Sequence, residues 1–179
     1  SPKAESKKAV SVSIDPVQKQ LNLDDGSQHG YDRLVLATGA VPRQLAAAAG
    51  LDGVFVLRHP DDAHALRAAV SGRQHAVVIG GGYIGLESAA VLSKLGHSVT
   101  VIEAMDRVLA RVAGPELSAF YEAEHRAHGV EIVTGAGLAS LAAAGDAKLA
   151  TLTDGRQIVA DVVIVGIGAA GVAVGKILM

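Results

Sequence analysis

The sequence predicts an α/β fold with a doubly wound parallel sheet, because short apolar strands alternate with helical stretches along most of the chain. The clearest example is the β-branched run Val77–Ile79, which a glycine-rich turn joins to a helical stretch at 86–95 and to a second strand at 98–102. The composition agrees, since 50% of the 179 residues are hydrophobic and 19% are charged, as in a globular protein with one substantial core. Such a sheet binds ligands at the carboxyl ends of its strands.

Residues 1–40 are expected to form a β-hairpin, with strands at 9–14 and 19–23, followed by a buried strand at 34–37. Residues 41–75 are expected to cross between two lobes and then to form a helix, because proline, alanine and glycine are frequent in the first part of this segment.

The helix in this crossing segment is expected to begin near Asp61. Asp61 and Asp62 place acid in its first turn and Arg67 lies later, as the helix dipole prefers. The two aspartates can also be interpreted as paired catalytic carboxylates, but their position at a helix start favours capping.

The turn after Val77–Ile79 carries the pattern GxGxxG, which reads Gly80-Gly81-Gly82-Tyr83-Ile84-Gly85. Gly80 permits a tight turn, Gly82 lets the backbone approach a pyrophosphate, and Gly85 lets the helix pack close to the strand. The helix N-terminus then offers phosphates its unpaired N–H groups and the positive end of its dipole. Glu103 ends the second strand, about 20 residues further on, where an acid accepts hydrogen bonds from an adenosine ribose. The unit therefore predicts dinucleotide binding.

The predicted nucleotide-binding domain, residues 76–168, contains one more helix and returns to the parallel sheet. Residues 115–128 form an amphipathic pattern, with Pro115 suited to the first turn of a helix and Gly129 to its stop. The remaining strands are expected at 130–133, as short antiparallel strands between 138 and 160, and at 162–165. Residues 169–179 form an atypical apolar tail.

Composition and charge exclude several classes of function. A net charge of −2 and the lack of a basic stripe disfavour binding to nucleic acid. The sequence contains no cysteine, so it has no disulfide and no thiolate metal site, and its chemistry must come from a cofactor. Residues 1–8 are polar, unlike a signal peptide, and the longest apolar run, 162–175, is too short to cross a membrane. The sequence therefore predicts a cytoplasmic protein without a membrane segment.

A metal site is not expected. His125 and His128 have the i, i+3 spacing of metal ligands on a predicted helix, but two ligands do not make a site. We expect both histidines to lie at a solvated helix end.

Three segments of the chain resemble the FAD-dependent pyridine nucleotide-disulfide oxidoreductase superfamily, in the order Tyr31–Ala40, Gly80–Glu87 and Asp161–Gly168. Within it, Val101–Glu103 followed by 107–112 and 115–118 is most similar to the NADH-dependent ferredoxin reductases that serve oxygenases and cytochromes P450. The resemblance covers roughly residues 10–168.

The resemblance implies that the chain is an NAD(H)-binding domain with a strip of the FAD domain, and that FAD belongs to the complete parent. Such a reductase passes a hydride from NADH to FAD and then single electrons to a ferredoxin or rubredoxin-type partner. It implies that Glu87 lies near the nicotinamide and the flavin as a catalytic residue, and that Arg111 helps to hold NAD. The other cofactor-binding residues that it implies are Thr38, Gly39, Arg43, Gly166, Ile167 and Gly168.

Some of these residues have a second interpretation. Glu87, expected in the first turn of the helix, also satisfies the helix dipole without any catalytic role. Arg107 and Arg111, spaced i, i+4, form either a phosphate clamp or part of a solvated face. Gly166, Gly168 and Gly171 repeat the GxGxxG spacing, which we interpret as a chance match or an altered terminus, because only eight residues follow Gly171.

Two alternative functions stay open at this point. One is a glutathione-reductase-like enzyme whose redox cysteines lie outside these residues. The other is a non-catalytic nucleotide-responsive module, similar to the apoptosis-inducing-factor flavoproteins, that acts through partners. A thioredoxin-reductase type of enzyme is disfavoured, because its cysteine pair would fall within the NAD domain and this sequence has no cysteine.

Overall fold

The computed structural model describes residues 10–72, 74–171 and 177–178, and the chain divides into two compact units. The first unit comprises Ser1–Ala40 with Gly171–Met179, and the second comprises Val41–Ala170. The predicted features of residues 1–8 and of much of the apolar tail lie outside the described residues. No helix among the described residues is long and apolar enough to cross a bilayer.

The described part of the first unit consists of strands and turns. The strands β1 (Ser11–Asp15), β2 (Gln20–Leu23) and β3 (Gln28–Gly30) form an antiparallel sheet, and β4 (Leu34–Val35) pairs with β15 (Ile177–Leu178). The predicted hairpin is present, and β3 extends it although its sequence has no apolar pattern. The prediction of a buried strand at 34–37 is wrong, because β4 has two residues and no described element covers Val35, which is 65% exposed.

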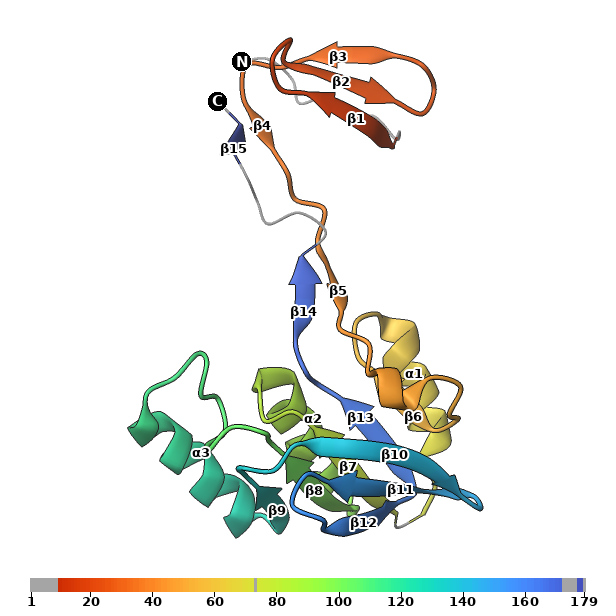
Figure 1. Ribbon diagram of the computed structural model, residues 1–179, viewed down its shortest axis with the longest axis vertical. Coiled ribbons are helices and arrows are strands. Elements are labelled where there is room, and N and C mark those ends of the chain that lie inside the picture. Colours follow the sequence, from red (N-terminus) through yellow and green to blue (C-terminus); the bar gives the residue numbers. More distant parts are fainter. Residues whose placement is uncertain (1–9, 73, 172–176, 179) are drawn as a thin grey trace. The chain divides into compact units, whose positions relative to one another are not determined.

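The second unit is built around a five-stranded parallel sheet with the strand order β6-β13-β7-β8-β9 (Figure 1). These strands are β6 (Val54–Val56), β7 (His75–Ile79), β8 (Ser98–Ile102), β9 (Val130–Val133) and β13 (Val162–Val165). The central strands are continuous apolar runs because both of their faces are covered. The predicted return of the last strand to the parallel sheet is confirmed, with β13 between β6 and β7.

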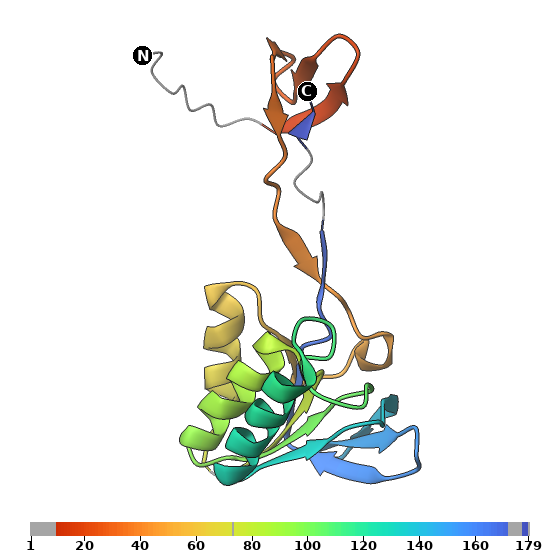
Figure 2. The same cartoon turned by 90° about the vertical axis from the view of Figure 1, so that its left-hand side faces the viewer.

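Different layers cover the two faces of this sheet (Figure 2). The helices α1 (Pro60–Ala69), α2 (Tyr83–Lys94) and α3 (Pro115–Ala127) lie on one face, and β10 (Leu138–Ala144), β11 (Ala147–Leu152) and β12 (Gln157–Ala160) form an antiparallel sheet on the other. Each face has its own apolar core. The α/β fold class is therefore confirmed, and the connection from β9 to β13 runs through the antiparallel sheet instead of a helix.

The helix boundaries agree with their sequence signals. Asp62 Oδ2 accepts hydrogen bonds of 2.7 Å from the backbone N–H groups of His59 and Arg58, and these bonds lower the pKa of the Asp62 carboxyl. The capping role is thus confirmed for Asp62. After α2 and α3, Gly96 and Gly129 have φ of +92° and +80°, the left-handed conformation that ends a helix.

The other short elements belong to the connections. They are the 3₁₀ turn η1 (Ala46–Ala48) and the strands β5 (Ala40–Pro42) and β14 (Ala169–Gly171), which pair with each other. In the repeated glycine spacing, Gly168 is followed directly by the strand β14 (Ala169–Gly171), so this pattern lacks the helix start that follows the second glycine of a fingerprint. This agrees with its interpretation as a chance match.

Candidate dinucleotide-binding site

A cleft of about 610 Å³ opens in the second unit at the carboxyl ends of β7, β8 and β13. This is the sheet edge at which the fold class predicts a ligand. The predicted site residues that line it are Gly80, Gly81, Gly82, Tyr83, Ile84, Glu103, Arg111, Gly166, Ile167 and Gly168. The structure therefore brings together residues from three separate parts of the sequence, and their roles in binding stay predictions.

The three fingerprint glycines have different local environments. Gly80 has φ of +106°, and a Cβ there would collide with the carbonyl oxygen of Gly166. A Cβ on Gly85 would collide with the carbonyl oxygen of Gly80, so this glycine lets α2 pack against the turn. A Cβ on Gly82 would have only the Gly166 oxygen nearby, at 4.0 Å. Gly80 and Gly85 are therefore required by the fold, whereas the space over Gly82 is open for a ligand.

The first turn of α2 is prepared for an anion. Gly82 is the N-cap residue and supplies no capping side chain, and the first turn contains no acidic residue. Tyr83 and Ile84, which follow it, are 48% and 49% exposed at the cleft. Unpaired N–H groups and the helix dipole at such a position favour a phosphate group.

Glu103 lies directly after β8, with both carboxylate oxygens held by backbone N–H groups. Its Oε2 accepts from Gly81 at 2.7 Å and its Oε1 accepts from Met105 at 2.8 Å. A carboxylate oxygen has two acceptor positions, so each can accept one more hydrogen bond from a ligand hydroxyl. The side chain is thus fixed beside the glycine turn with acceptor capacity left.

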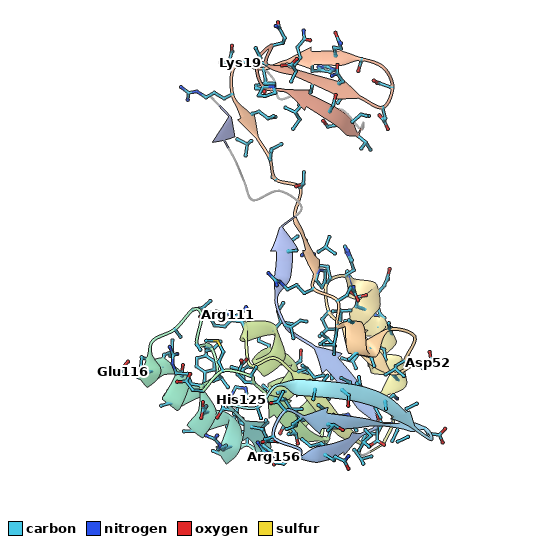
Figure 3. All side chains as sticks on the ribbon, viewed as in Figure 1. Lys19, Asp52, Arg111, Glu116, His125 and Arg156 are labelled. Carbon is cyan, nitrogen blue, oxygen red and sulfur yellow. The ribbon has the colours of Figure 1, made fainter. Side chains whose placement is uncertain are left out.

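The loop that connects β8 to α3, residues 103–114 and called the β8–α3 loop below, separates the two candidate arginines. Arg111 is exposed and lines the cleft (Figure 3), and no described residue accepts a hydrogen bond from its guanidinium. Arg107 donates instead to the carbonyl oxygens of Ala110 and Ala113 and to Ser118 Oγ. The i, i+4 clamp is therefore not formed, because the loop is not helical and Arg107 is bound to the loop backbone and to Ser118, whereas Arg111 lines the cleft.

The remaining predicted residues lie outside the cleft lining. Glu87 is exposed in the second turn of α2, since the helix begins at Tyr83, so the expectation that it sits in the first turn is wrong. Thr38 and Gly39 are exposed in the first unit. Arg43 is exposed in the second unit, and its backbone N–H donates to the carbonyl oxygen of Gly168 at 2.9 Å. The structure thus ties Arg43 to the turn after β13.

His125 is a correction to the sequence analysis. It is buried, not solvated, with Nδ1 at 2.8 Å from the Tyr121 carbonyl oxygen and Nε2 at 3.0 Å from the Leu86 carbonyl oxygen. The ring packs there because α3 lies against α2. His128 is exposed, as predicted, and no group of metal-ligating side chains occurs among the described residues.

The other wall of the cleft was not predicted. It includes Leu45 just before η1, Met105 and Leu109 of the β8–α3 loop, and Leu138 at the start of β10. These residues follow no common motif or period in the sequence. Only the fold places them side by side, so sequence patterns gave no signal for them.

Comparisons with known proteins agree with this geometry. The pyridine nucleotide-disulphide oxidoreductase family matches residues 4–175. The 5,5'-dehydrodivanillate O-demethylase ferredoxin reductase subunit of a Sphingobium species is 48% identical over 160 residues, which cover 87% of this chain and 39% of that protein. Putidaredoxin reductase of Pseudomonas putida is 43% identical over 164 residues, covering 88% of this chain and 39% of the reductase.

A solved structure shows the same arrangement. The ferredoxin reductase for the CYP199A2 system from Rhodopseudomonas palustris has a TM-score of 0.78 and 38% identity to this chain, with 91% of this chain and 41% of that one covered. The chain thus spans 39% of the length of the two relatives named above. Because the family match extends over nearly all of its residues, the chain belongs to the pyridine nucleotide-disulphide oxidoreductase family.

Proposed function

We propose that the chain is the NAD(H)-binding part of a larger FAD-dependent reductase that passes electrons from NADH to a ferredoxin or rubredoxin-type protein. Membership of the family implies the use of FAD and a pyridine nucleotide, and the relatives named above are ferredoxin and putidaredoxin reductases. Because the chain spans 39% of the length of these relatives, the electron transfer is a proposed property of the complete protein.

The single observation that carries the proposal is the position of Glu103 beside an open glycine turn. The space over Gly82 and the uncapped start of α2 suit a pyrophosphate. Glu103 is held next to them by the N–H groups of Gly81 and Met105, with acceptor capacity left for the two ribose hydroxyls of an adenosine. A carboxylate at that place favours NAD(H), because the 2′-phosphate of NADP(H) would meet a like charge.

We expect the chain to bind NADH more tightly than NADPH by about 1–3 kcal/mol, from lost ribose hydrogen bonds and charge repulsion. Isothermal titration calorimetry with both nucleotides measures this difference, and Glu103→Ala is expected to reduce it. Glu124→Ala is a matched control, because Glu124 is an exposed acid on α3 outside the cleft lining. Equal or tighter binding of NADPH by the wild-type chain would contradict the proposal.

FAD is proposed for the complete protein and not for the cleft in this chain. Among the described residues, one glycine turn leads from a parallel strand into a helix, so they contain one cradle for a dinucleotide. We propose that this cradle takes NAD(H). Contacts of Thr38, Gly39 and Arg43 with FAD, and a position of Glu87 near the nicotinamide, stay proposals for the complete reductase.

We expect the purified 179-residue chain to bind NADH but to contain no stoichiometric flavin and to reduce no ferricyanide. Hydride transfer requires an acceptor ring about 3–3.5 Å from the nicotinamide, and this chain has no second dinucleotide cradle in its described residues to hold one. The absorbance spectrum after desalting and an NADH:ferricyanide assay measure both properties. A yellow protein with one flavin per chain would contradict this expectation.

A further inference from the structure

The β8–α3 loop contains neither helix nor strand, yet part of it is buried. Val108 and Leu109 are 0% and 3% exposed, whereas Arg111 and Val112 are exposed and line the cleft. Leu109 has φ of +55°, in the left-handed region that favours glycine. A leucine keeps this conformation only where surrounding contacts impose it. The path of the loop therefore depends on groups that hold it in place.

Arg107 is the first of these groups. Its Nη1 donates to the carbonyl oxygen of Ala113 at 2.9 Å and to Ser118 Oγ at 2.8 Å, and its Nη2 donates to the carbonyl oxygen of Ala110 at 3.2 Å. Ala110 and Ala113 flank the segment that carries Arg111. Because the guanidinium is a rigid planar fork, it fixes the two ends of this segment relative to each other.

Ser118 is the second group and connects the loop to α3. It is 1% exposed, and its hydroxyl accepts from Arg107 while it donates to the carbonyl oxygen of Val108 at 2.6 Å. Removal of this hydroxyl would leave a buried carbonyl and an N–H of Arg107 without that partner. Ser118 therefore anchors both Arg107 and the enclosed part of the loop.

The loop is also bound to the glycine turn. The N–H of Leu109 donates to the carbonyl oxygen of Gly81 at 2.9 Å, and the N–H of Gly81 donates to Glu103 Oε2 at 2.7 Å. Both backbone polar groups of Gly81 are thus bound by the β8–α3 loop. A change in the path of this loop would therefore move the glycine turn as well as Arg111.

We propose that Arg107 and Ser118 are positioning residues for dinucleotide binding. Neither side chain lines the cleft, but together they hold the β8–α3 loop in the conformation in which Arg111 reaches it. This inference rests on the proposed dinucleotide function of the cleft. It requires that Arg107 and Ser118 affect NADH affinity through the position of Arg111. An effect that came only from a less stable fold would not satisfy this requirement.

A double-mutant cycle in the full chain tests this requirement. Arg107→Lys keeps the charge but not the planar fork, and Ser118→Ala removes only the hydroxyl. We expect each to raise the dissociation constant for NADH, measured by calorimetry, by about five- to tenfold. In a chain that already carries Arg111→Ala, the same substitutions are expected to change the dissociation constant for NADH by less than about twofold. Once Arg111 is absent, its position no longer affects binding, so the effects of coupled residues do not add.

The matched control is Arg156→Lys, which also keeps the charge but not the planar fork. Arg156 Nε donates to Asp154 Oδ2 at 2.7 Å, and Arg156 lies outside the cleft lining and the β8–α3 loop. Arg156→Lys should leave NADH affinity unchanged. If Arg107→Lys does not fold, the smaller Ser118→Ala change decides the question.

Two results would overturn the inference. One is an equal increase of the dissociation constant in both backgrounds, and the other is a folded Ser118→Ala chain with wild-type affinity. Either result leaves the proposed function intact as long as the wild-type chain binds NADH. A wild-type chain that binds no NADH would instead refute the proposed function itself.

Discussion

Gly85→Ala is expected to destabilise the chain by about 3 kcal/mol, which lowers the melting temperature of a protein of this size by roughly 6–12 °C. A Cβ at this position would collide with the carbonyl oxygen of Gly80 and lie 3.2 Å from Val78 Cγ1. Both neighbours belong to the buried strand β7 or to the turn that follows it, so neither can move cheaply. Differential scanning calorimetry measures the change.

Helix propensity makes the opposite prediction for the same substitution. Alanine is favoured over glycine in a helix by about 1 kcal/mol, and Gly85 lies within α2. We expect the steric term to outweigh this gain, because the clash involves backbone atoms. Gly82→Ala is the control, since its φ of −82° suits any residue and its Cβ would have open space. A Gly85→Ala chain as stable as wild type would contradict this expectation. It would show that α2 can move away from the Gly80 carbonyl without lowering the free energy of unfolding.

The parts of the fold that could be predicted from sequence carry strong local signals. The strand β13 is apolar over its length, and β7 is apolar after His75, because layers cover both faces of the sheet. Gly96 and Gly129 mark helix ends because the left-handed conformation is cheap for glycine. The glycine turn and Glu103 could also be predicted from a local signal. Their spacing is typical of a single strand-turn-helix-strand unit.

Sequence patterns were least informative for residues whose environment is set by distant parts of the chain. His125 was expected to be solvated because it lies near the end of a polar helix, but its ring is enclosed where the Leu86 carbonyl of α2 meets it. Arg107 and Arg111 are identical residues four positions apart. Only the loop conformation at Leu109 and the partner Ser118 separate their roles, and neither is visible as a pattern.

Gly82→Val is expected to raise the dissociation constant for NADH by at least about 100-fold, which corresponds to about 2.7 kcal/mol. In the protein alone, a Cβ on Gly82 would have only the Gly166 carbonyl oxygen within 4.0 Å, so the substitution should cost little stability. With a dinucleotide bound, the valine side chain would occupy the space through which the pyrophosphate approaches the backbone at the start of α2. Calorimetric titration with NADH measures the loss.

The comparison of Gly82 with Gly85 separates binding from folding within one turn. Gly82→Val is expected to keep the wild-type melting temperature and lose affinity, and Gly82→Ala should give a smaller loss because its side chain is shorter. Gly85→Ala is expected to lower the melting temperature even without ligand, since its clash is with the protein's own backbone. The decisive measurement is NADH affinity of a folded Gly82→Val chain. If that affinity equals the wild-type value, the pyrophosphate does not pass over Gly82, and the open space at the glycine turn has another occupant.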